Sequence, residues 1–259
     1  MAALASFESQ LCQIFKMAAL WITLSMACMN IVCAETKDGL LDAVRSGDLR
    51  RTRAVLSEGA DVNATNDTGQ TALMLAAGIA RVDIVRVLLD HHALVDAKDQ
   101  NGATAFMTAS RAGHLAVMKE LLKRGANINA TDNSGMTSVL AAIMSDQFGA
   151  ADYLVGAGAN VNIAAANGAT PLIASIVEGR TNSVALLLRH GADPNLKDKN
   201  GLTPLVSAVA RDRFEIVKLL VNAGAELNAT SPQGLTPLQI AELQGYIDVT
   251  NLLKERKVR

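Results

Sequence analysis

The chain has 259 residues, half of them apolar and only 3% aromatic, and its formal net charge at pH 7 is -1. This composition suits a thin core of alanine, leucine and valine between closely stacked helices better than a thick globular core. A charge so close to zero provides no basic stripe for nucleic acid and no acidic tail for a cationic partner.

The first 34 residues have the pattern of a secretory signal peptide. Lys16 precedes an apolar stretch from Met17 to Val32, and a polar run begins at Glu35. Val32 and Ala34 are the small residues expected just before a cleavage site that follows Ala34. We therefore expect residues 1–34 to be removed and the remaining chain to be periplasmic or secreted.

The N-terminal segment is also compatible with three other interpretations. An uncleaved signal anchor is one, although about 16 apolar residues broken by Asn30 are short for a bilayer core of about 30 Å. A lipoprotein is another, because Cys28 follows small residues, although the leucine that usually stands three residues earlier is missing. Translation from Met17 is the third, and it would remove Lys16, the basic residue of the leader.

Cysteine is confined to this leader, together with Trp21. The three cysteines are Cys12, Cys28 and Cys33, so residues 35–259 contain none. A disulfide framework is excluded in that part of the chain, as is a cysteine that acts as metal ligand or nucleophile. Its stability must therefore come from stacking.

A Gly-x-Thr triplet recurs with a fixed period of 33 residues, without insertion or deletion. A strict period in this range is typical of a solenoid, in which identical supersecondary units stack and present an extended surface. The six triplets are Gly69–Thr71, Gly102–Thr104, Gly135–Thr137, Gly168–Thr170, Gly201–Thr203 and Gly234–Thr236.

Each unit begins with a tight turn and a short helix. In the first unit, Gly69 stands where the turn needs a positive φ, and Thr71 stands at the N-cap of the helix. Leu73, Ala76 and Ala77 have the spacing of an apolar helix face, and the small residues allow close helix approach. Proline follows the threonine in three units, at a helix position that needs no N–H donor: Pro171, Pro204 and Pro237.

A second helix follows in each unit, with apolar residues at helical spacing such as Ile84, Val85 and Leu88. A Gly-Ala pair ends this helix in most units, and its glycine is the expected left-handed cap. His92 replaces that glycine in the first unit, so we expect a strained cap there. The pairs begin at Gly59, Gly125, Gly158, Gly191 and Gly224.

Together these residues resemble the ankyrin repeat. The shared pattern is Gly-x-Thr-Pro-Leu, Ala-Ala, Gly-His, Ile-Val, Leu-Leu and Gly-Ala-x-x-Asn, and it covers about residues 36–259. The resemblance implies an all-α repeat solenoid, an ankyrin-type stack of helix-turn-helix units with short β-hairpin connections. It gives an N-terminal capping unit at 35–65, a first to fifth repeat at 66–98, 99–131, 132–164, 165–197 and 198–230, and a C-terminal capping unit at 231–259.

Two departures from the family pattern are visible. The family commonly has histidine three residues after the threonine, where it makes a polar contact between repeats, and here we expect apolar packing instead. Ala150 and Ala151 replace the usual Ile-Val pair, so we expect the third repeat to be the weakest link in the stack. The residues at the histidine position are Met74, Met107, Leu140, Ile173, Val206 and Gln239.

The residues indicate no catalytic or metal-binding constellation. The four histidines are His91, His92, His114 and His190, and they form no cluster with cysteine and carboxylate at metal-ligand spacing. The glycines follow the 33-residue period rather than a phosphate-binding motif, and no nucleophile has an evident activating base. We expect a protein that is not an enzyme and that uses no cofactor and no metal.

Four Asn-x-Thr sequons bear on the source of the chain. The resemblance implies that the asparagine near the end of each repeat is bonded to the loop backbone and mostly covered. A glycan there would oppose stacking, which disfavours passage through a eukaryotic secretory pathway and favours a bacterial protein. The sequons begin at Asn63, Asn66, Asn129 and Asn228.

The resemblance also implies that a partner is bound by the hairpin tips and the inner-helix face. The apolar members of this surface gather in its central and C-terminal part, so we expect an apolar groove, with a rim of Asn, Gln and Ser, that grips a protein or peptide. The alternative is that these side chains pack against the hairpins and are less exposed. The candidate residues are Asp67, Gln70, Ile79, Asn101, Arg111, Asn133, Met136, Met144, Asn167, Val177, Leu202, Arg211, Leu235 and Leu243.

We therefore expect a non-catalytic protein–protein interaction module with an unidentified protein partner. No nucleic-acid partner is indicated, and no membrane partner unless the leader is retained. Two alternatives stay open: a structural helper that stabilises or protects a single exported enzyme, and a membrane-tethered scaffold that lies flush against the bilayer.

Overall fold

Residues 39–257 form two rows of antiparallel helices in a computed structural model, and the predicted signal peptide lies outside these described residues. A short helix at residues 39–45 opens the stack. The inner row then contains α3 (Ala72–Gly78), α5 (Ala105–Ala112), α7 (Ser138–Met144), α9 (Pro171–Val177), α11 (Pro204–Val209) and α13 (Pro237–Gln244). The outer row contains α2 (Leu49–Ser57), α4 (Val82–Asp90), α6 (Leu115–Lys123), α8 (Phe148–Gly156), α10 (Thr181–Arg189), α12 (Phe214–Asn222) and α14 (Ile247–Lys257).

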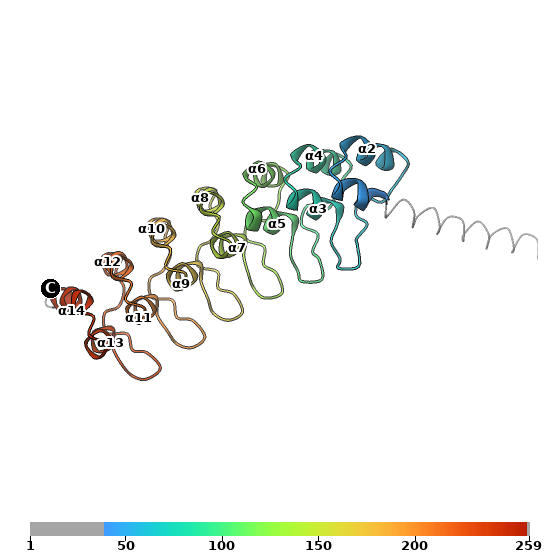
Figure 1. The fold of residues 1–259 in the computed structure, drawn as a ribbon. Helices are drawn as coiled ribbons and strands as arrows, with labels where there is room; N and C mark the ends of the chain where they lie inside the picture. The colour runs from blue at the N-terminus through green and yellow to red at the C-terminus, as the bar shows by residue number, and fades with distance from the viewer. Residues whose placement is uncertain (1–38, 258–259) are drawn as a thin grey trace, which may run out of the picture.

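The loops that connect successive units project beyond the inner row, on the side away from the outer helices (Figure 1). Isolated antiparallel bridges close two of them, between Thr65 and Thr71 and between Thr131 and Thr137. No longer strand forms within residues 39–257. The predicted fold class, a helical solenoid with hairpin connections, is confirmed.

Every inner helix from α3 to α13 begins at the repeat threonine. The threonine has extended φ and ψ, and its hydroxyl oxygen accepts a hydrogen bond from the backbone N–H three residues later, as between Thr71 and Met74 at 3.3 Å. Such a cap satisfies one of the donors that a helix N-terminus leaves open. The other caps are Thr104, Thr137, Thr170, Thr203 and Thr236, as predicted.

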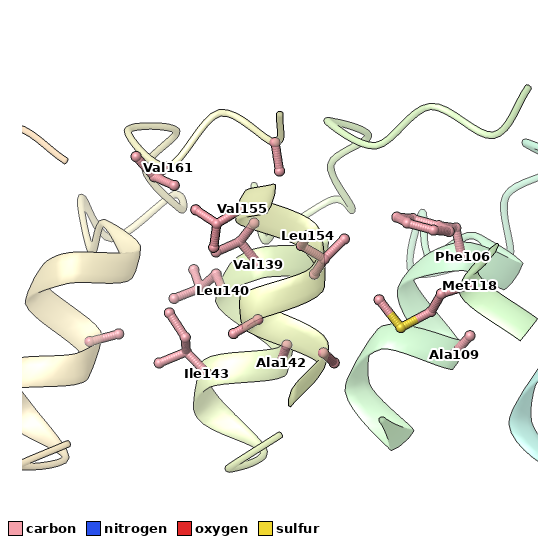
Figure 2. Packing of buried hydrophobic residues seen from close by; sticks show 14 of the residues in the cluster. Phe106, Ala109, Met118, Val139, Leu140, Ala142, Ile143, Leu154, Val155 and Val161 are labelled. Carbon is pink, nitrogen blue, oxygen red and sulfur yellow. The ribbon is translucent and has the colours of Figure 1, made fainter. Parts of the chain in front are cut away.

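The residue that donates its backbone N–H to the cap also packs its side chain into the stack. In the five repeats this position is apolar and at most 4% exposed, so the predicted apolar packing is confirmed there. Leu140 of α7, for example, lies in a cluster with Val139 and Ile143, while Leu154 and Val155 come from α8 (Figure 2). The C-terminal unit differs, because the Gln239 side chain is exposed and accepts a hydrogen bond from the backbone N–H of Thr236 at 2.9 Å.

The C-terminal face of the stack is polar where the other repeats are apolar. Gln239 and Glu242 stand where the fifth repeat has Val206 and Val209, both of which are buried. Glu242 forms an ion pair with Lys254 Nζ at 2.8 Å, and this pair joins α13 to α14. A polar outer face is typical of the terminal unit of a repeat stack.

The turns between inner and outer helices require a left-handed residue at a fixed position. Glycine occupies this position in four units, but Ala80, Asp146 and Asp212 occupy it in the first, third and fifth repeats, with φ of 60°, 58° and 51°. His92, the predicted strained cap at the end of α4, has φ of 64°. A side chain in this region costs roughly 1–2 kcal/mol per residue, so each of these turns carries strain. The four glycines are Gly47, Gly113, Gly179 and Gly245.

Side chains near the repeat ends link each repeat to the next. Asn129 Oδ1 accepts the backbone N–H of Asn160 at 2.8 Å, and Asn63 Oδ1 accepts that of Leu94 at 2.8 Å. The bond therefore goes to the following repeat rather than to the residue's own loop. Asn63 and Asn129 are half-buried, whereas Asn228 is exposed. The same link is made by Asp96, Asn162 and Asn195.

Candidate interaction surface

Backbone hydrogen bonds join the first five hairpin tips into one wall. The tips are residues 66–70, 99–103, 132–136, 165–169 and 198–202, and a sixth spans 231–235. In each link a backbone N–H of one tip donates to a carbonyl of the preceding tip, as from Asn133 to Asn101 at 2.9 Å. The other donors are Gln100, Ala166 and Lys199.

This wall stops before the sixth tip. The residue at the donor position there is Pro232, which has no N–H. A Cβ added to Gly168 would collide with the backbone of Lys199, whereas a Cβ on Gly201 would meet nothing within 4 Å. The sixth tip therefore stands apart from the fifth.

In most of the tips, an acidic or amide side chain accepts hydrogen bonds from backbone N–H groups of the same tip. Asp132 Oδ1 accepts the backbone N–H groups of Ser134 and Met136 at 2.8 and 2.9 Å, and Asp198 does the same in the fifth tip. The fourth tip has Ala165 at this position, so no such bond forms. Asn167 makes one of the two missing hydrogen bonds in another way, because its Oδ1 accepts the N–H of Ala169 at 3.0 Å. The fourth tip is thus the one with the smallest side chains.

The structure divides the predicted partner-binding residues into two groups. Those at the foot of the hairpins are half-buried: Gln70, Met136, Leu202 and Leu235. Those at the tips and at the ends of the inner helices are exposed: Asp67, Ile79, Asn101, Arg111, Asn133, Met144, Asn167, Val177, Arg211 and Leu243. The predicted apolar strip is therefore only partly open to a partner.

A hollow of about 270 Å³ opens between the third and fourth repeats. It brings together three of the predicted residues, Met136, Met144 and Asn167, while the others lie outside it. Met144 is 51% exposed at the end of α7, so a partner that covers it removes apolar surface from water. No lining residue is charged. The remaining lining residues are Ser134, Leu140, Ala165, Ala166 and Ala169.

Sequence reasoning missed a second row of exposed apolar side chains. Leu115, Phe148 and Ile247 are 38%, 43% and 72% exposed at the first position of α6, α8 and α14. Phe148 also lines a hollow of about 310 Å³ beside Arg180 at the turn edge of the stack. The 33-residue period contained the signal, because Leu49, Val82 and Phe214 occupy the same position in other units.

Among residues 39–257, some charged side chains near the hollow form ion pairs, and others form none. Asp146 and Glu178 both pair with Arg180, with N–O distances of 3.3 and 3.8 Å. Arg111 and Lys199 are exposed, and neither forms an ion pair with any other residue between 39 and 257. Near the hollow, Arg111 and Lys199 are therefore more available to a ligand than Asp146 and Glu178.

Ion pairs on the outer row of helices stabilise the stack instead. Glu120 of α6 is 7% exposed, and it lies between Arg86 at 3.0 Å and Arg124 at 3.3 Å. At the start of α4, the hydrogen bond from Arg81 lowers the pKa of the Asp83 carboxyl below its usual value. These groups lie on a different side from the hairpin wall, where they join adjacent outer helices or lie at the start of one.

The described residues contain no group of three or more His, Cys, Asp and Glu side chains that could hold a metal ion. No helix between residues 39 and 257 combines the length and the apolar character needed to cross a membrane.

Known proteins share this architecture. Family models described as ankyrin repeats match residues 40–132, 127–198 and 187–241. The crystal structure of the ankyrin repeat domain of Bcl-3, described as a unique member of the IkappaB protein family, is similar with a TM-score of 0.76. The sequences are 27% identical, and the match covers 83% of this chain and 97% of that one. No curated protein sequence matches the chain. Ankyrin repeat domains are in general protein–protein interaction modules and are typically non-catalytic.

Proposed function

Because the chain belongs to the ankyrin repeat family, we propose that it binds a partner protein or peptide through its hairpin tips and inner-helix groove. The observation that carries this proposal is the hollow between the third and fourth repeats. It is open, uncharged and lined by two methionines, whose flexible side chains adapt to the shape of a ligand. The wall of hairpin tips, joined by backbone hydrogen bonds, stands beside it.

The hollow fits a contact surface better than a reaction site. Fully burying a Met side chain contributes about 1.5–3 kcal/mol relative to exposure, so covering the half-exposed Met144 contributes on the order of 1 kcal/mol. Interfaces obtain much of their affinity from a few such apolar anchors in desolvated pockets. The polar tips then form the rim, which can donate and accept hydrogen bonds around the anchor.

A pair of single substitutions tests this function. Met144 and Phe148 are four residues apart, are 51% and 43% exposed, and line different hollows. We expect a partner captured from the native host by the wild-type protein to bind the Met144→Asp variant at least tenfold more weakly. The matched Phe148→Asp variant should bind it within twofold of wild type.

The same two variants also show which result would contradict binding in the groove. Loss of the partner with Phe148→Asp and retention with Met144→Asp would assign binding to the turn edge and contradict the groove. Circular dichroism and thermal unfolding of both variants provide the control for folding, since both side chains are exposed in the wild type.

We also propose that the protein is exported from a bacterial cell. Lys16, the apolar stretch from Met17 to Val32 and the small residues up to Ala34 support this, as does the lack of cysteine in residues 35–259. The half-buried sequon residues Asn63 and Asn129 support a bacterial source, because a glycan would displace their bonds to the next repeat.

N-terminal sequencing of the protein from its native host tests the export proposal. The expected first residue is Glu35, in the envelope or the medium. A chain that retains residues 1–34 in the membrane fraction would support the anchor instead, and a full-length chain in the cytoplasm would contradict export.

A further inference from the structure

We propose that the hollow between the third and fourth repeats binds one large apolar side chain of an extended partner segment that has acidic residues beside this anchor. The inference rests on the proposed function, because it names the kind of partner that the groove takes.

The hollow exists because the fourth hairpin lacks side chains that its neighbours have. Ala165 stands where the third and fifth tips have Asp132 and Asp198, and Ala166 stands where they have Asn133 and Lys199. The missing atoms leave the space beside Met136 and Met144 open. Neighbouring pairs of repeats have bulkier tips at these positions. The small side chains of the fourth tip therefore interrupt the wall of hairpin tips at this hollow.

The size and lining of the hollow favour one apolar side chain. Its volume of about 270 Å³ lies just below the range of about 300–1,000 Å³ that is typical of small-molecule pockets. Apart from Ser134 and Asn167, the lining residues are methionine, leucine and alanine, so a charged side chain placed there would lose its water without gaining an oppositely charged partner. Leucine, methionine or phenylalanine would gain apolar contact on several sides.

The rim of the hollow suits the backbone of an extended segment. Asn167 Oδ1 already accepts the N–H of Ala169 at 3.0 Å, and its Nδ2 amide forms no hydrogen bond within the described residues. This amide is exposed and can donate to a backbone carbonyl that crosses the tip. A helix has no free carbonyls along its sides, because its backbone groups bond one another.

The charges next to the hollow select acidic neighbours for the anchor. Lys199 lies on the adjacent fifth tip, and Arg111 lies one repeat before Met144 at the end of α5, both without an ion pair among residues 39–257. The nearby carboxylates are engaged: Asp132 and Asp198 accept N–H groups of their own tips, and Asp146 pairs with Arg180. An acidic residue on either side of the anchor therefore meets an available cation.

A random 12-residue peptide display library, panned on the purified protein, provides the probe. We expect the enriched peptides to share one Leu, Met or Phe with Asp or Glu within a few residues. Synthetic versions of these peptides, labelled for fluorescence polarisation, then give affinities for defined variants.

Two matched pairs of variants test the site. Ala166→Phe fills the hollow, whereas Ala164→Phe changes an exposed residue of the same hairpin that does not line it. We expect at least a tenfold loss of affinity for the first variant and less than a twofold change for the second. Lys199→Glu should weaken binding at least threefold, and less so in high salt, while Lys197→Glu at another exposed position should not.

Other results would overturn the inference. Enriched peptides of a different composition, or peptides that bind Ala166→Phe as tightly as wild type, would leave peptide binding intact but remove this site. A dimer in light scattering that Ala166→Phe abolishes would assign the hollow to a second copy of the chain. Enrichment of no peptide would contradict the inference, and the proposed function would also fail if no host partner were captured.

Discussion

Two rows of side chains flank the repeat threonine, and the stack constrains them differently. Three residues after the threonine, the five repeats have apolar side chains that are at most 4% exposed. One residue before the threonine, all six side chains are half-buried: Gln70, Ala103, Met136, Ala169, Leu202 and Leu235. The first row varies in size but not in polarity. The second varies in both size and polarity, from glutamine to alanine, methionine and leucine, so it is the row that can encode a partner.

Substitutions in the two rows of one repeat should differ most in the unfolding free energy that they cost. Leu140 is 1% exposed, and Leu140→Ala should cost about 2–5 kcal/mol of unfolding free energy because it leaves a cavity between repeats. Met136→Ala removes a half-buried side chain at the foot of the hairpin and should cost about 1 kcal/mol. Urea unfolding followed by circular dichroism measures both, and equal losses would contradict the distinction between the rows.

The polar links between repeats should come next. Asn129→Ala removes the acceptor for the Asn160 N–H and should destabilise the protein by about 1 kcal/mol. Asn228→Ala changes the exposed equivalent in the last loop and should stay within about 0.5 kcal/mol of wild type. Thermal unfolding compares the two variants; a larger loss from Asn228→Ala would mean that these links do not hold the repeats together.

Relief of backbone strain should stabilise the stack without changing the groove. His92→Gly places glycine at a φ of 64° and should gain about 1 kcal/mol. Ala112→Gly, at the exposed end of α5, should instead lose about 0.5–1 kcal/mol because glycine is more flexible in the unfolded chain. Partner affinity should be unchanged in both, and a changed affinity would show that the stack and the groove are coupled.

The smallest expected effect concerns the third repeat, which we predict to be the weakest link. α8 has Ala150 and Ala151 in its buried face and glycine at Gly149, which faces open space. Gly149→Ala should therefore stabilise the protein by about 0.5–1 kcal/mol. The change in the urea midpoint measures it, and an unchanged midpoint would mean that this helix does not limit the stability of the stack.

The period of the sequence predicted the features that recur in every unit. The threonine caps, the two helices, the apolar row that includes Leu140 and the strained His92 all follow from it. The strain at Ala80 was not predicted, because the turn between inner and outer helices has glycine in some units only. A residue's position in the repeat predicts its local structure, whereas a unit that departs from the pattern can be understood only from the three-dimensional structure.

The candidate site was predictable only in part for the same reason. Met136, Met144 and Asn167 were identified one by one, but the hollow that unites them depends on Ala165 and Ala166 being small in the next repeat. A space between two units is a property of both, and no single repeat shows it. The effect of Pro232 on the sixth tip likewise depends on a hydrogen bond that other units make.

We place the partner against the hollow between the third and fourth repeats. Backbone amide chemical shifts of the ¹⁵N-labelled protein, recorded with and without its captured partner, test this most directly. We predict the largest changes at Ala165, Ala166, Ala169 and Met144. Changes confined to Leu115, Phe148 and Ile247 would place the partner on the turn edge and contradict it.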